Sequence, residues 1–493
     1  MPRPIPARRA LRRLAPALAA GAALAAATAP AVAHADDALT LSDTTTTIAP
    51  GITLRSFQTL SASGWLKAKV LTADLSAPTL HSDMLTASPF VTAAAPLSQT
   101  ATNAGAIAAI NGDFFNIGDT NATSGFELRG DTLLKSSNAP GSRTTVAGVD
   151  GDGIGRLADL TLSGTAVFKG SNHPIKAVNS PAPPANSIDL ITPDWGAYTR
   201  NSGVFKAASP KIEVIVGADG TVVAKSDTPT AAQLAPGSYA LVAYGATTKN
   251  LDALSVGDPV SISYGVSSTI AQKLQYAIGG AVALVRNGVV PAAVHYDSPS
   301  DEVDVQGRPA LGFKDGGRTM LLVVVDGHQS DVPGLTAQQM AAFMKSLGAD
   351  DALLFDGGGS AELVARDPGD SAVSIQNTPS DGAERPVPNG IGLFAQAGDG
   401  TPHQLIVSPG GADARVFPGL HRTFAAKATD DQDAPVAVAA GDVRWSADAG
   451  DVDGDGVLAA PADAAGTTIA LHASDGGATQ ATSVRACSAG WRR

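Results

Sequence analysis

The stretch between residues 319 and 360 constrains the fold of this chain more than any other. Met320–Val325 is an unbroken apolar run, as expected for a strand buried on both faces of a sheet. Thr336, with Gln339 three residues later, is typical of a helix start, and Gly348 is typical of a helix end. A second apolar run follows. Strand, helix and strand within about forty residues predict a crossover between two parallel strands.

Both predicted strands are followed by an Asp-Gly pair, Asp326 after the first and Asp356 after the second. Because parallel strands end at the same edge of a sheet, where ligands bind, both carboxylates should reach one rim. Their backbones would lie about 5 Å apart on neighbouring strands and about 10 Å apart with one strand between them. Carboxyl pairs at such separations serve glycoside cleavage, and close pairing raises one of the two pKa values.

The loop after the second strand is nearly free of side chains. Gly357, Gly358 and Gly359 precede Ser360, so backbone N–H groups of this loop can approach an anion or a sugar oxygen closely. A single Asp-Gly pair is most often only a turn. Two such pairs on one rim, one of them extended by further glycines, favour a binding site.

Four other segments place polar groups at the ends of predicted strands. They are Asn111–Phe115, Ile278–Gly280, Arg308–Gly312 and the proline-stiffened loop Asp381–Gly390, which carries Glu384, Arg385 and Asn389. Arginine matches phosphate with a two-pronged guanidinium. Taken singly, each segment also fits a turn, a bulge or a solvated loop.

Taken together, these segments supply seven short motifs in the order in which the phosphodiester glycosidase family has them. They are Asn-Gly-x-Phe-Phe (111–115), Ile-Gly-Gly (278–280), Arg-Pro-Ala-Leu-Gly (308–312), Val-Asp-Gly-His (325–328), Leu-Thr-Ala-Gln-Gln-Met (335–340), Leu-Phe-Asp-Gly-Gly-Gly-Ser (354–360) and Glu-Arg-Pro-Val-Pro-Asn (384–389). The chain therefore resembles this family over about residues 60–396. The resemblance implies hydrolysis of a sugar-1-phosphodiester, N-acetylglucosamine-1-phosphodiester-like, at its glycosidic bond.

Carried over residue by residue, the resemblance implies a site that contains Asn111, Arg308, Asp326, Asp356, Gly357, Gly358, Gly359, Ser360, Arg385 and Asn389. We expect Asp326, Asp356 and, as a further candidate in the same loop as Arg385, Glu384 to be the catalytic acids. The other residues of this set, together with His328, are expected to bind the substrate. One acid would assist water or the sugar cation, another would act as its acid–base partner, and the cationic side chains would hold the phosphate. The chain departs from the family at His328, where Arg is frequent, and at Asp113, where a small residue is common.

The fold class that follows is α+β. A mixed β-sheet catalytic domain with few helices is expected over residues 36–398, followed by an all-β immunoglobulin-like module over residues 400–493. The last residues, from Cys487 onward, do not continue the strand pattern of that module, so we expect a truncated terminus.

Residues 1–35 are predicted to be a signal peptide, with five arginines before an Ala/Leu stretch and a small-x-small cleavage site. We therefore expect a secreted or extracellular protein, with cell-wall association as a further option. Without the leader the chain has 29 basic and 46 acidic side chains, a net charge of −17, which disfavours nucleic acid as a partner. No transmembrane segment is expected in the mature chain, and the single Cys487 excludes intrachain disulfides and cysteine zinc sites.

Other functions stay open at this stage. A phosphoglycan or cell-envelope polysaccharide is the expected substrate. The alternative is a non-catalytic cell-envelope glycan-binding protein, which would not need the paired aspartates. Ser360 alone suggests a serine hydrolase, although the histidines that follow it fall in the C-terminal module. The sequence identifies no cofactor. A divalent cation such as calcium is an alternative at Asp451–Gly456, where Ala462 replaces the usual bidentate Glu and a turn is favoured.

Overall fold

A computed structural model of the chain describes residues 38–296 and 299–488. The predicted signal peptide, residues 1–35, lies outside the described residues. No helix of the described part is long and apolar enough to cross a membrane. The chain forms sheets with few helices, so the mixed β fold is confirmed.

The predicted crossover lies in the first sheet. This sheet has seven strands in the order β1-β2-β3-β19-β18-β20-β17. Their bounds are β1 Leu39–Ala49, β2 Ile52–Ser61, β3 Gly64–Asp74, β17 Ala283–Val285, β18 Arg308–Lys314, β19 Thr319–Val325 and β20 Asp351–Leu354. Because β18 is antiparallel to both β19 and β20, those two strands run parallel with one strand between them. The parallel crossover is therefore confirmed.

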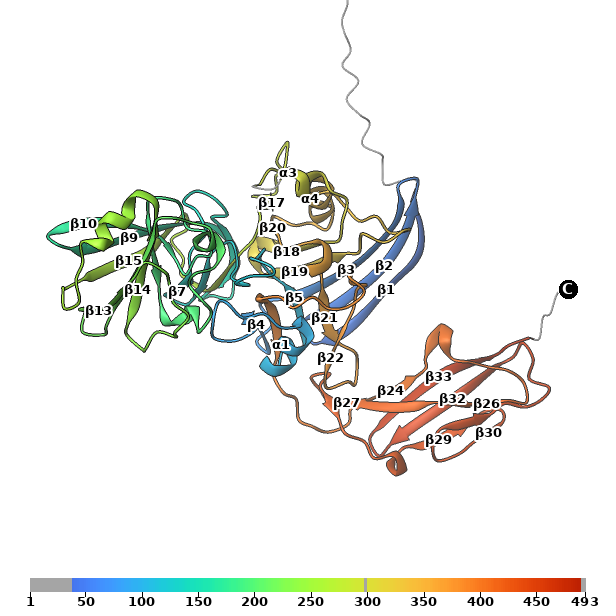
Figure 1. Ribbon diagram of the computed structural model, residues 1–493. Coiled ribbons are helices and arrows are strands. Elements are labelled where there is room, and N and C mark those ends of the chain that lie inside the picture. The colour runs from blue at the N-terminus through green and yellow to red at the C-terminus, as the bar shows by residue number, and fades with distance from the viewer. Residues whose placement is uncertain (1–37, 297–298, 489–493) are drawn as a thin grey trace, which may run out of the picture. The chain divides into compact units, whose positions relative to one another are not determined.

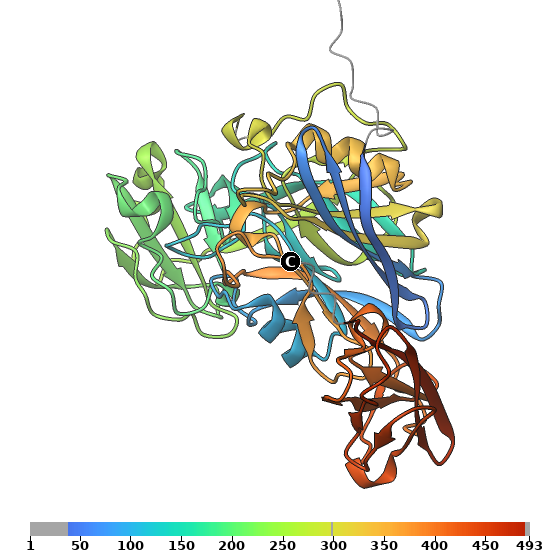
Figure 2. The ribbon, with the colours of Figure 1, turned by 90° about the vertical axis from the view of Figure 1, so that its right-hand side faces the viewer.

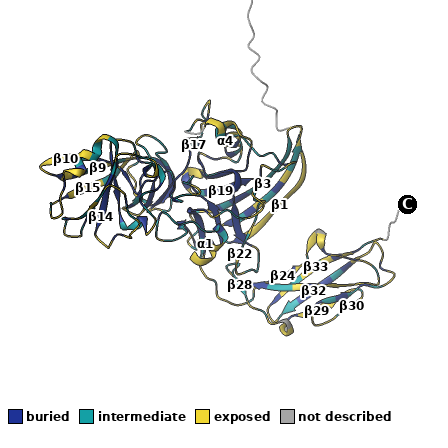
Figure 3. Ribbon diagram, viewed as in Figure 1, coloured by how far each residue is buried: buried dark blue, intermediate teal, exposed yellow. Residues whose placement is uncertain are grey.

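Helix α4 (Ala337–Ser346) joins β19 to β20 and covers one face of the sheet (Figure 1). Its capping box is present, since the Thr336 hydroxyl accepts from the Gln339 N–H and the Gln339 side chain accepts from the Thr336 N–H. Successive residues of β19 alternate between two cores, one against α4 and one against the next sheet. This explains why the strand is apolar and buried from Met320 to Val325, where the ribbon is dark blue in Figure 3.

The opposite core is shared with a sheet of five antiparallel strands in the order β22-β21-β5-β23-β4. The strands are β4 Leu80–Thr86, β5 Ala108–Asn111, β21 Leu363–Arg366, β22 Val373–Ile375 and β23 Asn389–Ala395. Helix α1 (Leu97–Ala104) packs against it through Leu97 and Ala101. In Figure 2 the long blue strands β1 to β3 extend the first sheet beside this pair of layers.

The chain between β5 and β17 forms most of an eleven-stranded sheet with its own core. Its strands are β6 Glu127–Arg129, β7 Thr132–Lys135, β8 Thr145–Asp150, β9 Gly155–Phe168, β10 Ser171–Val178, β11 Ile188–Ile191, β12 Lys211–Val216, β13 Val222–Ser226, β14 Tyr239–Tyr244, β15 Ser261–Ser268 and β16 Leu274–Gly279. The short helices α2 (Thr248–Asp252) and α3 (Pro299–Val303) lie in connections.

Residues 404–486 form three small sheets and, within the described residues, no α-helix. The strands are β24 Gln404–Ser408, β25 Arg415–Val416, β26 His421–Thr423, β27 Ala425–Thr429, β28 Pro435–Val436, β29 Arg444–Ala447, β30 Asp451–Val452, β31 Val457–Ala459, β32 Thr468–Asp475 and β33 Ala478–Ala486. The Asp453 carboxylate accepts from the N–H groups of Asp455 and Val457, so the calcium-like stretch forms a turn. The immunoglobulin-like assignment stays a prediction.

Candidate active site

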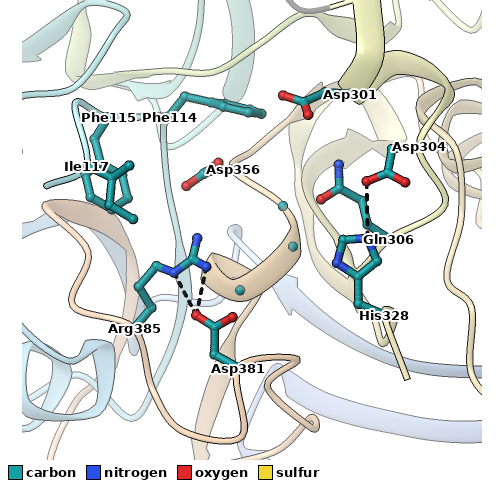
Figure 4. Close-up of a pocket in the computed structure, with 13 residues that line it drawn as sticks. Phe114, Phe115, Ile117, Asp301, Asp304, Gln306, His328, Asp356, Asp381 and Arg385 are labelled. Carbon is teal, nitrogen blue, oxygen red and sulfur yellow. Dashed lines mark hydrogen bonds and ion pairs between the residues drawn. The ribbon is translucent and has the colours of Figure 1, made fainter. Parts of the chain in front are cut away.

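A pocket of about 380 Å³ opens where β20 ends (Figure 4). It is lined by Phe114, Phe115, Ile117, Asp301, Asp304, Gln306, His328, Asp356, Gly357, Gly358, Gly359, Asp381 and Arg385. Six of the twelve predicted site residues are in this lining: His328, Asp356, the three glycines and Arg385.

Asp356 occupies the centre of the pocket in Figure 4. Its backbone is fixed from both sides, because its N–H donates to the Gly112 carbonyl (2.9 Å) and its carbonyl accepts from the Asn111 side-chain amide (2.8 Å). Burial raises the pKa of the Asp356 carboxyl to about 7, against the opposing effects of the Ser360 hydroxyl and the Arg385 charge. The pocket thus holds a carboxyl that can gain or lose a proton near neutral pH.

The glycine loop after Asp356 forms a short 3₁₀ turn, Gly358–Ser360. Gly358 has a φ of 59°, which favours glycine. A Cβ atom on Gly359 would overlap both the Arg385 guanidinium and the Asp381 carboxylate. Glycine is therefore required at position 359 so that the Arg385 guanidinium can approach the loop this closely.

Arg385 is oriented by Asp381, which lines the pocket, and by the buried Ser360. Its Nε and Nη2 atoms lie 2.9 and 2.7 Å from Asp381 Oδ2, and its Nη1 donates to Ser360 Oγ (3.2 Å). Ser360 is buried and does not line the pocket itself. Its observed role is to hold the arginine that does.

His328 lies on the opposite wall, with Nε2 3.1 Å from Asp304 Oδ2 (Figure 4). Asp301, Asp304 and Gln306 share this wall and were not predicted. Their only sequence signal was an acidic stretch directly before the Arg308 motif. Ile117 and Asp381 were missed as well.

Asp326 reaches the predicted rim but does not line the pocket. Its side chain is buried, and its Oδ1 accepts from the Thr378 N–H (3.0 Å). Burial raises the pKa of Asp326, while hydrogen bonds from Thr378 and Asn377 and the charge of Lys67 oppose the shift. The structure therefore separates Asp326 from Asp356, and the predicted cooperation of the two acids is not seen in this geometry.

Arg308 is fully buried, which does not suit the predicted phosphate contact. Its Nε donates to the Leu335 carbonyl (3.1 Å), its Nη1 to the Tyr296 hydroxyl (3.2 Å), and its Nη2 to the carbonyls of Asp301 and Asp304. Since these acceptors occupy the guanidinium, Arg308 holds the wall that carries Asp301 and Asp304.

Glu384 is also directed away from the pocket. Its carboxylate accepts from the Ser98 N–H (3.0 Å) and hydroxyl (2.7 Å) and pairs with the Glu362 carboxyl. Burial tends to raise the Glu384 pKa, but the bonds from Glu362 and Ser98 outweigh it and lower the pKa. Glu362 takes the proton of the pair, and its pKa is raised to about 9 by burial and by Glu384.

The two predicted amides are buried supports. Asn111 bonds to the backbone of both Asp356 and Glu362, and it thereby ties β5 to the glycine loop. Asn389 accepts from the Asp113 N–H (3.0 Å) and donates to Glu127 (2.7 Å). Neither lines the pocket.

Among the described residues, one group of acids is close enough to share a metal ion: Asp399, Asp430 and Asp431. None of them lines the pocket. The four acids that line the pocket, Asp301, Asp304, Asp356 and Asp381, form no such group.

Comparison with known proteins bears on the motifs that run through this site. Residues 203–394 match the family described as phosphodiester glycosidase. The resemblance to the phosphodiester glycosidase family is confirmed. The matched range contains every lining residue of the pocket except the Phe114–Ile117 wall. No curated protein matches the chain.

Solved structures resemble the fold of this phosphodiester glycosidase-like chain. A hypothetical protein from Synechocystis has a TM-score of 0.59 and 21% identity, over 72% of this chain and 64% of that one. A putative exported protein from Burkholderia pseudomallei has a TM-score of 0.54 and 21% identity, over 67% and 74%. The zebrafish N-acetylglucosamine-1-phosphodiester alpha-N-acetylglucosaminidase catalytic domain, auto-inhibited by its pro-peptide, covers 73% and 89% at 15% identity, with a TM-score of only 0.37. The first two show a shared fold.

Proposed function

We propose that this chain is a secreted glycosidase that hydrolyses a sugar-1-phosphodiester, N-acetylglucosamine-1-phosphodiester-like, to free sugar and a phosphomonoester. The observation that carries the proposal is Asp356, a carboxyl with a pKa near 7 that faces a pocket beside the oriented cation Arg385. A cation and a proton-transfer group in one pocket are what this reaction needs.

The phosphate is assigned to the Arg385 side of the pocket. There the guanidinium lies against the glycine loop, whose residues present backbone to the pocket, and the neighbouring Asp381 carboxylate is paired with the arginine. Arg385 is held by Asp381 and Ser360, so little orientation entropy is lost when the phosphate binds.

The sugar is assigned to the space between two unlike walls. Phe114, Phe115 and Ile117 offer apolar surface for the face of a sugar ring. Across the pocket in Figure 4, Asp304, Gln306 and His328 offer hydrogen-bonding groups for its hydroxyls. A polar ring with an apolar face matches both walls.

Asp356 is assigned the proton transfer. In its ionised form it takes a proton from a water molecule that attacks C1 of the sugar. The C1–O bond breaks, and its electron pair leaves with the phosphate as a phosphomonoester, which needs little protonation. Asp326 and Glu384 act as positioning residues, since Asp326 is bonded to the loop at Thr378 and Glu384 to the first turn of helix α1, both outside the pocket.

The test is hydrolysis of methyl N-acetylglucosamine-1-phosphate in water enriched in ¹⁸O, followed by mass spectrometry of both products. We expect the label in the sugar hydroxyl and none in methyl phosphate. Label in the phosphate would show cleavage of the P–O bond, and the chain would then be a phosphodiesterase. No turnover of this or of longer sugar-1-phosphodiesters would refute the proposal.

Export and substrate source belong to the same proposal. We expect the processed chain outside the cell, acting on a phosphoglycan or cell-envelope polysaccharide. Mass spectrometry of the chain recovered from culture supernatant and cell-wall fractions should show a new N-terminus after Ala35. Recovery of the unprocessed chain from the cytoplasm alone would contradict this.

A further inference from the structure

Behind the aromatic wall of the pocket stands an arginine that no sequence motif singled out. The guanidinium carbon of Arg143 lies 4.4 Å from the centroid of the Phe114 ring and 6.0 Å from that of Tyr296. Its side chain is only 8% exposed. The backbone of Arg143 has a φ of 45°, a left-handed conformation that non-glycine residues rarely adopt and that surrounding contacts must hold.

Arg143 faces a buried acid. Its Nη1 atom lies 3.9 Å from Asp113 Oδ1, and the Asp113 side chain is fully buried. The other oxygen, Oδ2, accepts from the Gly125 N–H, and the Asp113 N–H donates to the Asn389 side chain. Asp113 is therefore fixed in place, and the nearby arginine offsets part of the cost of burying its charge.

This pair is connected to the pocket through the end of β5. The carbonyl of Gly112 accepts from the Asp356 N–H, so the backbones that carry Asp113 and Asp356 are directly bonded. The residue after Asp113 is Phe114, which lines the pocket together with Asp356. Arg143 itself does not line the pocket.

We propose that Arg143 is a positioning residue of this site, which holds the Phe114 wall and, together with Asp113, sets the charge on Asp356. The inference rests on the proposed function only for its kinetic consequence, since the charge on Asp356 is a property of the folded chain. The two residues act on Asp356 in opposite directions. Asp113 brings a second negative charge toward Asp356, and Arg143 neutralises that second charge.

The charges around Asp356 agree with this geometry. Beyond burial and the Ser360 hydroxyl, the charged groups acting on its pKa are Arg385 and Arg143, which lower it, and Asp113, which raises it. The other titratable groups that line the pocket with Asp356 are Asp301, Asp304, His328 and Asp381, and Asp381 is bonded to Arg385. Loss of Arg143 should thus raise the Asp356 pKa, and loss of the Asp113 charge should lower it.

The test measures titration of the Asp356 carboxyl by ¹³C NMR of the full mature chain, with the resonance assigned by its absence in Asp356→Asn. We expect Arg143→Gln and Asp113→Asn to shift the midpoint in opposite directions, up and down, by about half a pH unit each. Arg143→Lys, which keeps the charge, should titrate like the wild type. Arg286→Gln, at an exposed arginine paired with Asp159, is the matched control and should change nothing.

The same shifts in the Asp356 pKa predict changes in kcat/KM. In the acid range, where kcat/KM follows ionised Asp356, half a unit corresponds to about a threefold loss in Arg143→Gln and about a threefold gain in Asp113→Asn. A purely structural role would lower kcat/KM in both variants and leave the midpoints in place.

The outcomes separate the two proposals. Shifts of the same sign, or no shift, would overturn the assignment of Arg143 whatever the activity. Opposite shifts in a chain that turns over no sugar-1-phosphodiester would support Arg143 and refute the proposed function. If Arg143→Gln does not fold, Asp113→Asn and Arg143→Lys still decide, since the first must lower the midpoint and the second must keep it.

Discussion

The ends of β19 and β20 look alike in sequence and differ in what they do. Each strand ends in an aspartate followed by glycine, and both ends reach one rim of the same sheet. Asp356 faces the pocket, whereas Asp326 is buried against the loop at Thr378. A strand end thus brings an acid to a rim, but the loops packed over that rim decide whether the acid meets a ligand.

The same difference, between a side chain that faces the pocket and one that is bonded elsewhere, separates two other pairs of predicted site residues. Arg385 faces the pocket, and Arg308 is enclosed by carbonyl groups. Glu384, the neighbour of Arg385 in sequence, turns toward Ser98 and Glu362. In each pair one member faces the pocket, and the other is bonded to neighbouring segments of the fold outside it.

The largest expected difference is between Asp356→Asn and Asp326→Asn. Asparagine keeps the size of the side chain but cannot take a proton. We expect Asp356→Asn to lower kcat by about a thousandfold, within the range for loss of a general acid or base. Asp326→Asn should lower kcat less than tenfold, because an amide oxygen can still accept from the Thr378 N–H. Steady-state kinetics on a sugar-1-phosphodiester measure both.

Equal losses in the two variants would mean that Asp326 takes part in the chemistry. The contrast between Asp356 and Asp326 would then be wrong, and the reacting groups of the pocket would include Asp326. Thermal melting of both variants checks that neither has lost its fold.

The next difference is between Arg385→Gln and Arg308→Gln, and it should appear in different measurements. Loss of the Arg385 charge should raise KM for the phosphodiester and lower kcat/KM about a hundredfold, with little change in stability. Loss of the Arg308 guanidinium removes four hydrogen bonds made by a fully buried side chain, so the free energy of unfolding should fall by about 3 kcal/mol. Denaturant unfolding and kinetics should therefore rank the two variants in opposite order.

The parts of the site that the sequence could predict are those set by local rules. The crossover, the capping box at Thr336 and the shared rim follow from periodicity and from parallel strand geometry. The one strand between β19 and β20 was an open alternative, because spacing along the chain does not tell whether β18 enters between them.

What the sequence could not predict depends on contacts between distant segments. Arg143 is 213 residues from Asp356 in the chain, and only the packing of β5 brings Asp113 and the Phe114 wall between them. Burial of Asp326 likewise depends on Thr378, 52 residues away. The sequence motifs identified the candidate acids and arginines, among them Asp326, Asp356, Arg308 and Arg385. The exposure of each of these side chains depends on the tertiary fold.

The smallest expected effect concerns Glu384 and its partner Glu362, and it sharpens the contrast with Asp356. The Glu362 pKa of about 9 lies well above its ordinary value, so the folded chain keeps a proton that the unfolded chain releases. Stability from this pair is present below the ordinary glutamate pKa and is lost as pH rises toward 9. Glu362→Gln can donate the same hydrogen bond at any pH.

We therefore expect the melting temperature of the wild type to fall more steeply than that of Glu362→Gln between pH 7 and pH 10, by a few degrees. Ser98→Ala, which removes a neutral partner of Glu384, is the control. It should lower the melting temperature at every pH without changing how steeply the melting temperature falls with pH. Parallel curves for wild type and Glu362→Gln would show that the two carboxyls share no proton. Because neither glutamate faces the pocket, the pH profile of kcat/KM should keep its midpoint in Glu362→Gln, whereas changes around Asp356 should move it.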